Sequence, residues 1–157
     1  MASKLNPYLN FKDNTRQAME FYKTVFGGTL TMTSFKEGGM SSGPADDQKV
    51  MHATVQVGDS TIMICDEMEG APAQPVILYL YVEDAEQLFK KATQAKATVL
   101  HEMEDQFYGD RVGAVKDEWG NVWWIGKHVE DVDEKELERR SKIVMKERRE
   151  KGNEVHA

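Results

Sequence analysis

The sequence predicts an α+β fold of two similar modules, each with the element order βαβββ, followed by a charged helical tail. The order strand, helix, strands occurs twice, and the predicted helix starts at Asn14 and Asp84 lie 70 residues apart, as do Gln17 and Gln87. Strands mixed with two connecting helices are typical of α+β domains. Two such sheets, each covered on one face by its helix, leave their other faces to form a cleft, a usual place for a ligand.

The first module is predicted over about residues 5–66. Asn14 with Gln17 three residues later is a helix N-cap pattern, and Gly27-Gly28 ends the helix. In the segment 50–57, apolar residues alternate with polar ones, so His52 lies on the face opposite Ala53. The elements are an extended stretch at 7–11, a helix at 14–26, a strand at 29–35, a loop at 36–49, and a hairpin of strands 50–57 and 61–65.

The second module is predicted over about residues 75–128, and both modules together form one domain over residues 1–130. Asp84 followed by Gln87 is again an N-cap pattern. The elements are a strand at 76–82, a helix at 84–95, an extended stretch at 97–100, a polar loop at 102–110, and strands at 111–116 and 122–125.

The tail, residues 131–157, is mostly charged and predicts a helix that begins at the cap Asp133. Oppositely charged residues four apart stabilise such a helix by about 0.2–0.5 kcal/mol per pair. The pairs are Glu136 with Arg140, Glu138 with Lys142, and Glu147 with Lys151. Two interpretations stay open: a solvated helix lightly docked on its own domain, or a helix that packs on a partner subunit.

Composition argues against several classes of function. Lys and Arg total 20 against 27 Asp and Glu, a net charge of −7, and an acidic chain repels the phosphates of nucleic acids. The longest apolar run, Val76–Val82, is far shorter than the roughly 20 residues of a membrane span. The N-terminus has no apolar stretch typical of a signal peptide, and the single Cys65 forms no intrachain disulfide. We therefore expect a cytoplasmic protein that binds neither nucleic acid nor membranes.

Several motifs resemble those of one known superfamily. They are Asn6-Pro-Tyr-Leu-Asn-Phe11, Ala18-Met-Glu-Phe-Tyr22, Val25-Phe-Gly-Gly28, Val57-Gly-Asp-Ser60, Phe107-Tyr-Gly-Asp-Arg111, Asp117-Glu-Trp-Gly120 and His128-Val-Glu-Asp-Val132. They are similar to motifs of the glyoxalase / bleomycin resistance / dioxygenase superfamily, also called vicinal oxygen chelate proteins. The motifs of the second half resemble its PhnB-like branch, whose members often carry the label demethylubiquinone methyltransferase-like. The resemblance covers about residues 5–135, and it implies paired βαβββ modules and commonly a homodimer.

The resemblance also implies where a metal would bind. Metalloenzymes of the superfamily use four ligands, usually His and Glu, from the first and last strand of each module. Matching the motifs places these positions at Pro7, Met63, Ile77 and Trp124. None of these side chains is a good donor for a divalent metal. We therefore expect no metal and no cofactor, which argues against glyoxalase, extradiol dioxygenase and fosfomycin-type transferase activities together.

Five residues remain as candidates for ligand binding, and three of them have a purely structural alternative. His52 faces the cleft if its apolar neighbours meet the helix; otherwise it is a hydrogen-bonded structural residue. Arg111 either binds a carboxylate or phosphate, or pairs with a nearby aspartate to fix its loop. Trp124 offers aromatic surface for a planar ligand, or it fills the space of the missing metal, and Tyr79 extends the aromatic lining. Met63 offers a soft contact to varied ligands.

These residues support three hypotheses about function. The first is a metal-free binder of a small hydrophobic or aromatic molecule in the cleft between the modules. The second is a glyoxalase-like enzyme, of lyase, dioxygenase or transferase type, with His52 or Arg111 in place of a metal. The third is an interaction protein that uses the C-terminal helix.

Overall fold

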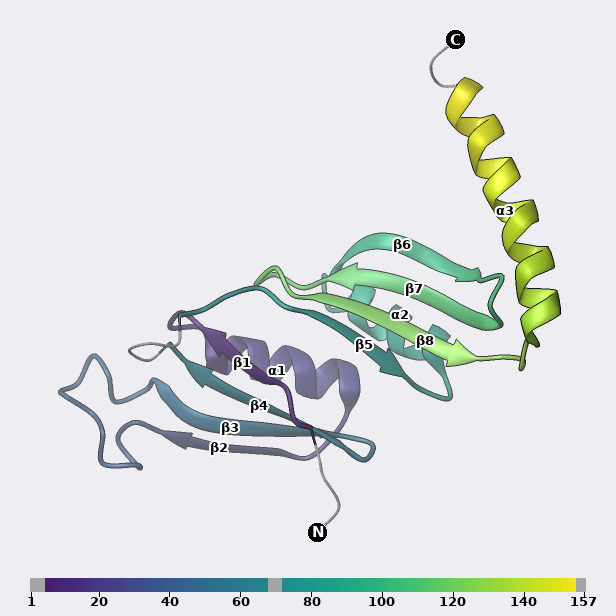
Figure 1. Ribbon diagram of the computed structural model, residues 1–157. Helices are drawn as coiled ribbons and strands as arrows, with labels where there is room; N and C mark the ends of the chain where they lie inside the picture. Colours follow the sequence, from purple (N-terminus) through teal and green to yellow (C-terminus); the bar gives the residue numbers. More distant parts are fainter. Residues whose placement is uncertain (1–4, 68–71, 155–157) are drawn as a thin grey trace.

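The computed structural model describes residues 5–67 and 72–154, and the predicted element order occurs in it twice (Figure 1). The first module contains β1 (Tyr8–Phe11), α1 (Thr15–Phe26), β2 (Leu30–Ser34), β3 (Val50–Val57) and β4 (Ser60–Asp66). The second contains β5 (Ile77–Tyr81), α2 (Ala85–Gln94), β6 (Thr98–Asp105), β7 (Asp110–Lys116) and β8 (Val122–His128), and α3 (Glu134–Glu154) follows. The predicted α+β fold of two βαβββ modules with a C-terminal helix is confirmed.

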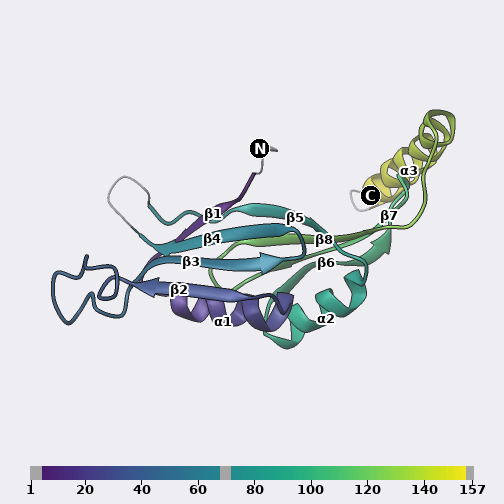
Figure 2. The same ribbon diagram turned by 90° about the horizontal axis from the view of Figure 1, so that it is seen from below.

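Each module forms its own four-stranded sheet, with the orders β1-β4-β3-β2 and β5-β8-β7-β6. The first strand of each module pairs in parallel with the last one, and the other pairs are antiparallel. Figure 2 shows α1 and α2 on the same side of the two sheets. We call the sides turned away from these helices the open faces. Successive strand residues alternate between the helix-covered face and the open face.

Burial follows this alternation. In β1, Leu9 and Phe11 are buried under the helix, whereas Tyr8 is exposed on the open face. In β5, the half-buried Leu78 and Leu80 lie between the exposed Ile77, Tyr79 and Tyr81. The helices contribute apolar residues at helical spacing to the same core: Ala18, Met19, Tyr22 and Val25 from α1, and Ala85, Phe89 and Ala92 from α2.

The N-terminus of α1 is capped differently from the prediction. Asn14 occupies the N-cap position, but its side chain makes no capping hydrogen bond. Instead, one carboxylate oxygen of Asp66, at the end of β4, accepts from the backbone N–H and the hydroxyl of Thr15, at 3.1 and 2.7 Å. Its other oxygen accepts from the N–H of Val50 at 2.6 Å. A contact 51 residues away in the chain therefore replaces the local cap. In α2 the predicted cap is confirmed, because Asp84 accepts from the N–H of Gln87 at 3.0 Å.

The polar loop predicted at 102–110 is partly wrong. β6 continues through Asp105 as the edge strand of the second sheet, with two register shifts against β7. Most of its side chains are exposed, so its sequence lacks the apolar alternation that marks a half-buried strand. β8 also extends beyond the prediction, to His128.

A buried hydrogen-bond network joins the two modules. The hydroxyl of Tyr22 on α1 donates to Oδ2 of Asp117, in the turn between β7 and β8, at 2.6 Å. The same oxygen accepts from Nε1 of Trp123 at 3.1 Å and from Nδ2 of Asn121 at 3.1 Å. Burial and the neighbouring Asp117 carboxylate raise the pKa of Tyr22 far above its usual value, so the hydroxyl stays protonated and donates. Trp119 packs edge-on against Phe11, Phe21 and Tyr22 at the same junction.

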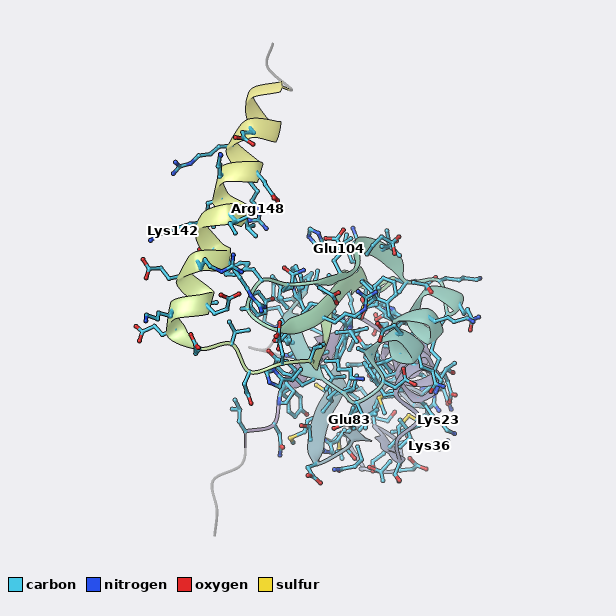
Figure 3. All side chains as sticks on the ribbon, turned by 90° about the vertical axis from the view of Figure 1, so that its right-hand side faces the viewer. Lys23, Lys36, Glu83, Glu104, Lys142 and Arg148 are labelled. Atoms are coloured by element: carbon cyan, nitrogen blue, oxygen red, sulfur yellow. The ribbon has the colours of Figure 1, made fainter. Side chains whose placement is uncertain are left out.

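The tail is helical and projects away from both sheets (Figures 1 and 3). Asp133 accepts from the N–H of Glu136 at 2.9 Å, which confirms the predicted cap. The pairs Glu136 with Arg140 and Glu138 with Lys142 form at 2.7 and 2.6 Å. The side chain of Lys151 lies outside the described part of the chain, so the third predicted pair is untested. No helix in the described ranges is both long and apolar enough to cross a membrane.

Candidate functional site

An apolar cavity of about 310 Å³ lies where the two modules approach each other. We call it the seam cavity. Its walls come from the start of β1, the hairpin of β3 and β4, and strands β5 and β8. They consist of Leu5, Pro7, Val57, Ser60, Ile62, Leu78, Tyr79, Leu80 and Trp123. None of these side chains is charged, and their polar groups are the hydroxyls of Ser60 and Tyr79 and the indole N–H of Trp123, which donates to Asp117. Such a cavity favours an uncharged, largely apolar ligand.

Aromatic rings continue from the seam cavity across the open face of the second sheet. Tyr79 lies parallel to Trp124, with ring centroids 6.4 Å apart and an interplanar angle of 4°. His101 stacks on the same tryptophan at 5.0 Å, and Tyr81 follows Tyr79 at 4.9 Å. Gly126 makes this arrangement possible, because a Cβ there would lie only 3.0 Å from the Tyr79 ring. Tyr79 and Tyr81 remain 45% and 58% exposed, so their rings can stack with a planar ligand.

Hydrogen bonds hold the two tyrosines of this face in the neutral form. The hydroxyl of Tyr81 donates to Oδ2 of the buried Asp110 at 2.5 Å, and this bond raises the pKa of Tyr81. Burial raises the pKa of Tyr79 strongly, and its hydrogen bond to Tyr81 adds to the shift. Both phenols are therefore hydrogen-bond donors rather than bases at neutral pH.

The open face of the first sheet carries a different, more polar set. The hydroxyl of Tyr8 and Nδ1 of His52 are 3.2 Å apart, and Met63 pairs with Tyr8 in the strand register. The thiol of Cys65 donates to Oδ1 of Asn10 at 3.0 Å. Burial raises the pKa of the Cys65 thiol and raises the pKa of Tyr8 to about 12. At neutral pH this thiol is not ionised, so it is a poor nucleophile.

The structure divides the five predicted site residues into three groups. Tyr79 lines the seam cavity, and Trp124 stacks beside it on the second open face. His52 and Met63 are half-buried on the open face of the first sheet. Arg111 belongs to neither group.

Arg111 lies on the helix-covered side of the second sheet, away from the other candidates. In the sheet register Trp124 lies opposite Ala114 of β7, and Arg111 is three residues from Ala114 along the same strand. Because strand side chains alternate between faces, Arg111 and Trp124 point to opposite faces of the sheet. Its guanidinium binds Glu86 of α2 and Asp105 of β6, the latter at 3.0 Å. The predicted pairing with a nearby aspartate is confirmed for Asp105. In this geometry the guanidinium faces α2 and not the open face, and binding of an anionic ligand by Arg111 stays a prediction.

The residues present do not fit the superfamily's metal site. Met63 pairs with Tyr8, so the open-face position beside Met63 on the first strand is Tyr8 rather than the predicted Pro7. In the second sheet, Ile77 pairs with Val122. Neither a neutral phenol nor these apolar side chains bind a divalent metal well. Within residues 5–67 and 72–154, no three His, Cys, Asp or Glu side chains come together to hold a metal ion.

Two features of the second open face were missed from the sequence. Asp110 and His128 pair across β7 and β8, with Oδ1 and Nδ1 2.9 Å apart. Extending the hairpin outward from the predicted turn at 117–120 brings these two residues opposite each other, so their pairing could have been predicted from the sequence. His101 carried no such signal, because it reaches Trp124 only through the register shifts of β6.

Comparison with known proteins places this geometry in a family. A relative from Mycobacterium bovis, Uncharacterized protein Mb0911c, is 32% identical over 145 residues, which cover 85% of this chain and 89% of the relative. Protein PA1353 from Pseudomonas aeruginosa has a similar crystal structure, with 30% identity and a TM-score of 0.66 over 81% of this chain and 98% of that one.

A more distant neighbour shares the fold alone. The putative 3-demethylubiquinone-9 3-methyltransferase, PhnB protein, from Bacillus cereus has 21% identity and a TM-score of 0.57 over 80% of this chain and 99% of that one. The family model that describes the Glyoxalase/Bleomycin resistance protein/Dioxygenase superfamily matches residues 4–125. The chain therefore belongs to the glyoxalase / bleomycin resistance / dioxygenase superfamily.

Proposed function

We propose that this protein is a PhnB-like, metal-free binder of a small, uncharged hydrophobic or aromatic molecule. The observation that carries the proposal is the seam cavity of about 310 Å³, whose lining has no charged side chain. Burial of apolar ligand surface there is favourable by roughly 25 cal/mol per Å². A charged ligand would lose its hydration without gaining a partner in the cavity.

The aromatic residues beside the cavity support a ligand with a planar ring. Tyr79 belongs to both the cavity wall and the row of stacked rings, so one ligand can contact apolar side chains and an aromatic face together. The hydroxyl of Tyr79 donates its proton to Tyr81, so its oxygen is an acceptor for one polar hydrogen of such a ligand. Shape and ring stacking, rather than charge, would then select the ligand.

The binding test uses N-phenyl-1-naphthylamine, a neutral aromatic probe that fluoresces in apolar surroundings. We expect saturable binding to the wild-type protein. Leu80→Glu places a carboxylate in the cavity wall at a half-buried position, and we expect it to weaken binding at least about tenfold. Val99→Glu is the matched control, because Val99 is exposed on β6 of the same sheet and lies outside the cavity lining. Equal affinities of the two variants would contradict the proposal.

We further propose that two copies of the chain form a homodimer through the second open face. Ile77, Tyr79 and Tyr81 are 73%, 45% and 58% exposed there, and a monomer rarely leaves a large apolar patch uncovered. The resemblance to a superfamily that commonly dimerises supports this. Light scattering at micromolar concentration is expected to give twice the chain mass of 17.9 kDa. Ile77→Glu is expected to return the monomer mass, and a monomeric wild type would refute the proposal.

We propose a cytoplasmic location for this function. The single cysteine, Cys65, is buried and its thiol pKa is raised, which suits a protein that keeps its thiol in the reduced form.

A further inference from the structure

The segment 129–133, which links β8 to α3, lies against the turn at 107–110. The N–H groups of Val129 and Glu130 both donate to the carbonyl oxygen of Gly109, at 2.9 and 3.0 Å. Gly109 has a φ of 97°, and a Cβ there would lie 2.2 Å from the carbonyl oxygen of Glu130. This close backbone contact fixes where the linker leaves the second sheet.

His128 adds a side-chain connection at the same place. Its Nδ1 lies 2.9 Å from Oδ1 of Asp110, and its Nε2 lies 3.1 Å from Oδ1 of Asp131. Asp110 is buried in the sheet and also accepts from Tyr81, whereas the Asp131 side chain is fully exposed on the linker. A carboxylate only accepts hydrogen bonds, so both bonds exist together only when both ring nitrogens carry a proton.

The position of α3 depends on this linker. Arg140 of α3 binds Glu130 of the linker, and Asp133 caps the first turn of the helix. Over the described residues, no hydrogen bond or ion pair connects an α3 side chain to either sheet. All three views show α3 projecting from the body, and Lys142 and Arg148 mark its outer part in Figure 3.

We propose that His128 is a pH-sensitive latch that ties the linker, and with it α3, to the second sheet when its ring is protonated. When the ring becomes neutral, one N–H is lost. The bond to buried Asp110 is retained because that carboxylate is fixed in the sheet, and the exposed Asp131 is released. The backbone contact at Gly109 then opens more often but is not lost, so the change is a loosening of the linker rather than an unfolding of the sheet.

The sign of the pH dependence follows from the surroundings of His128. Hydrogen bonds to Asp110 and Asp131 raise the pKa of His128 above its usual value of about 6.5. The latch is therefore fully formed below that usual value and is lost as the pH rises through the raised pKa. Tyr81 contacts His128 through Asp110, and Asp59, Glu83 and Lys127 line the groove beside it. These groups remain in a His128→Gln variant, which therefore isolates the contribution of the ring.

The test is amide hydrogen exchange of Val129 and Glu130, corrected for intrinsic rates, at about pH 5.5 and about pH 8.5. In the wild type we expect protection at these amides to fall about two- to fivefold at the higher pH, as suits one exposed ionic hydrogen bond. Asp131→Asn, at an exposed position that folding does not need, is expected to remove this pH dependence, as is His128→Gln. His101→Gln is the matched control and should retain it, because His101 stacks on Trp124 away from the linker.

An NMR titration of the His128 ring completes the test. We expect a pKa above the usual value in the wild type and a lower one in Asp110→Asn and Asp131→Asn. The proposal is overturned if the wild-type pKa is at or below the usual value. It is also overturned if His128→Gln and Asp131→Asn lose protection at high pH as the wild type does.

Discussion

The first sheet turns hydroxyls, an amide and a histidine toward its open face, whereas the second sheet turns aromatic rings toward the same side of the molecule. Under the helices the sheets are alike, with Leu9 and Phe11 in one and Leu78 and Leu80 in the other. Packing against a helix restricts the covered positions to apolar side chains, and the open positions are free of that restriction. The two modules therefore differ on their open faces, and we propose that the ligand binds beside these faces, at the seam.

Asp66 in the first module and Asp117 in the second are both buried, and they stabilise different parts of the molecule. Asp66 is 3% exposed and ties α1 to β3 within the first module. Asp117 is equally buried and accepts five hydrogen bonds, including the one from Tyr22 of the other module. Asp66 stabilises a module, and Asp117 stabilises their junction, which forms beside the seam.

The largest expected effect separates these two carboxylates. Asp117→Ala removes the acceptor of the Tyr22 hydroxyl, of Nε1 of Trp123 and of the backbone N–H of Asn121, all of them buried, and we expect it to lower the free energy of unfolding by about 4 kcal/mol. Asp66→Ala leaves fewer donors without an acceptor, and we expect it to lower the free energy of unfolding by about 2–3 kcal/mol. Urea denaturation followed by circular dichroism measures both. Asp59→Ala, in the exposed hairpin turn, is the control, with an expected change within about 0.5 kcal/mol. A cost for Asp117→Ala as small as the control's would show that the junction does not depend on this network.

A smaller effect compares the two open faces in ligand binding. Tyr79→Ala removes a ring from the cavity wall, and we expect it to weaken N-phenyl-1-naphthylamine binding about tenfold. His52→Ala changes the open face of the first sheet and is expected to alter the affinity less than about twofold. Fluorescence titration of both variants gives the comparison. A stronger effect at His52 would move the ligand to the first sheet.

The smallest effect compares the ends of the two helices. α1 ends at Gly27 with a φ of 72°, whereas α2 is followed by Lys96 with a φ of 73°. A side chain in this left-handed conformation costs about 1 kcal/mol, and glycine avoids that cost. We expect Gly27→Ala to destabilise the protein by about 1 kcal/mol and Lys96→Gly to stabilise it by about 0.5 kcal/mol. Thermal unfolding that moves in the same direction for both variants would contradict this reading of the helix ends.

The sequence predicted the repeated fold well because its signals are local. Helical spacing, the Asp84 cap and the alternation in 50–57 each depend on neighbouring residues, and all of them are present in the structure. Asn14 holds the predicted N-cap position, but its side chain makes no capping bond, and the helix end is instead tied to Asp66, which is distant in the chain. β6 was missed in part because an exposed edge strand carries little apolar pattern.

The candidate site was only partly predictable for the same reason. Tyr79 and Trp124 follow from alternation in single strands, and their stacking is as expected for neighbours on one face. The strand pattern around Arg111 does not determine its face, and the sheet register places it on the side of α2. The seam cavity depends on how two modules meet, which no single segment of the sequence encodes.

The most direct test of the central claim is methyl NMR of the protein titrated with N-phenyl-1-naphthylamine. A ligand in the seam cavity must shift the methyl signals of Val57, Ile62, Leu78 and Leu80, which line it from both modules. Aromatic ring currents act over short distances, so the signals of Met63 on the first open face and Val144 on α3 should move little. Shifts concentrated at Met63 or Val144, with the cavity methyls unchanged, would contradict the account.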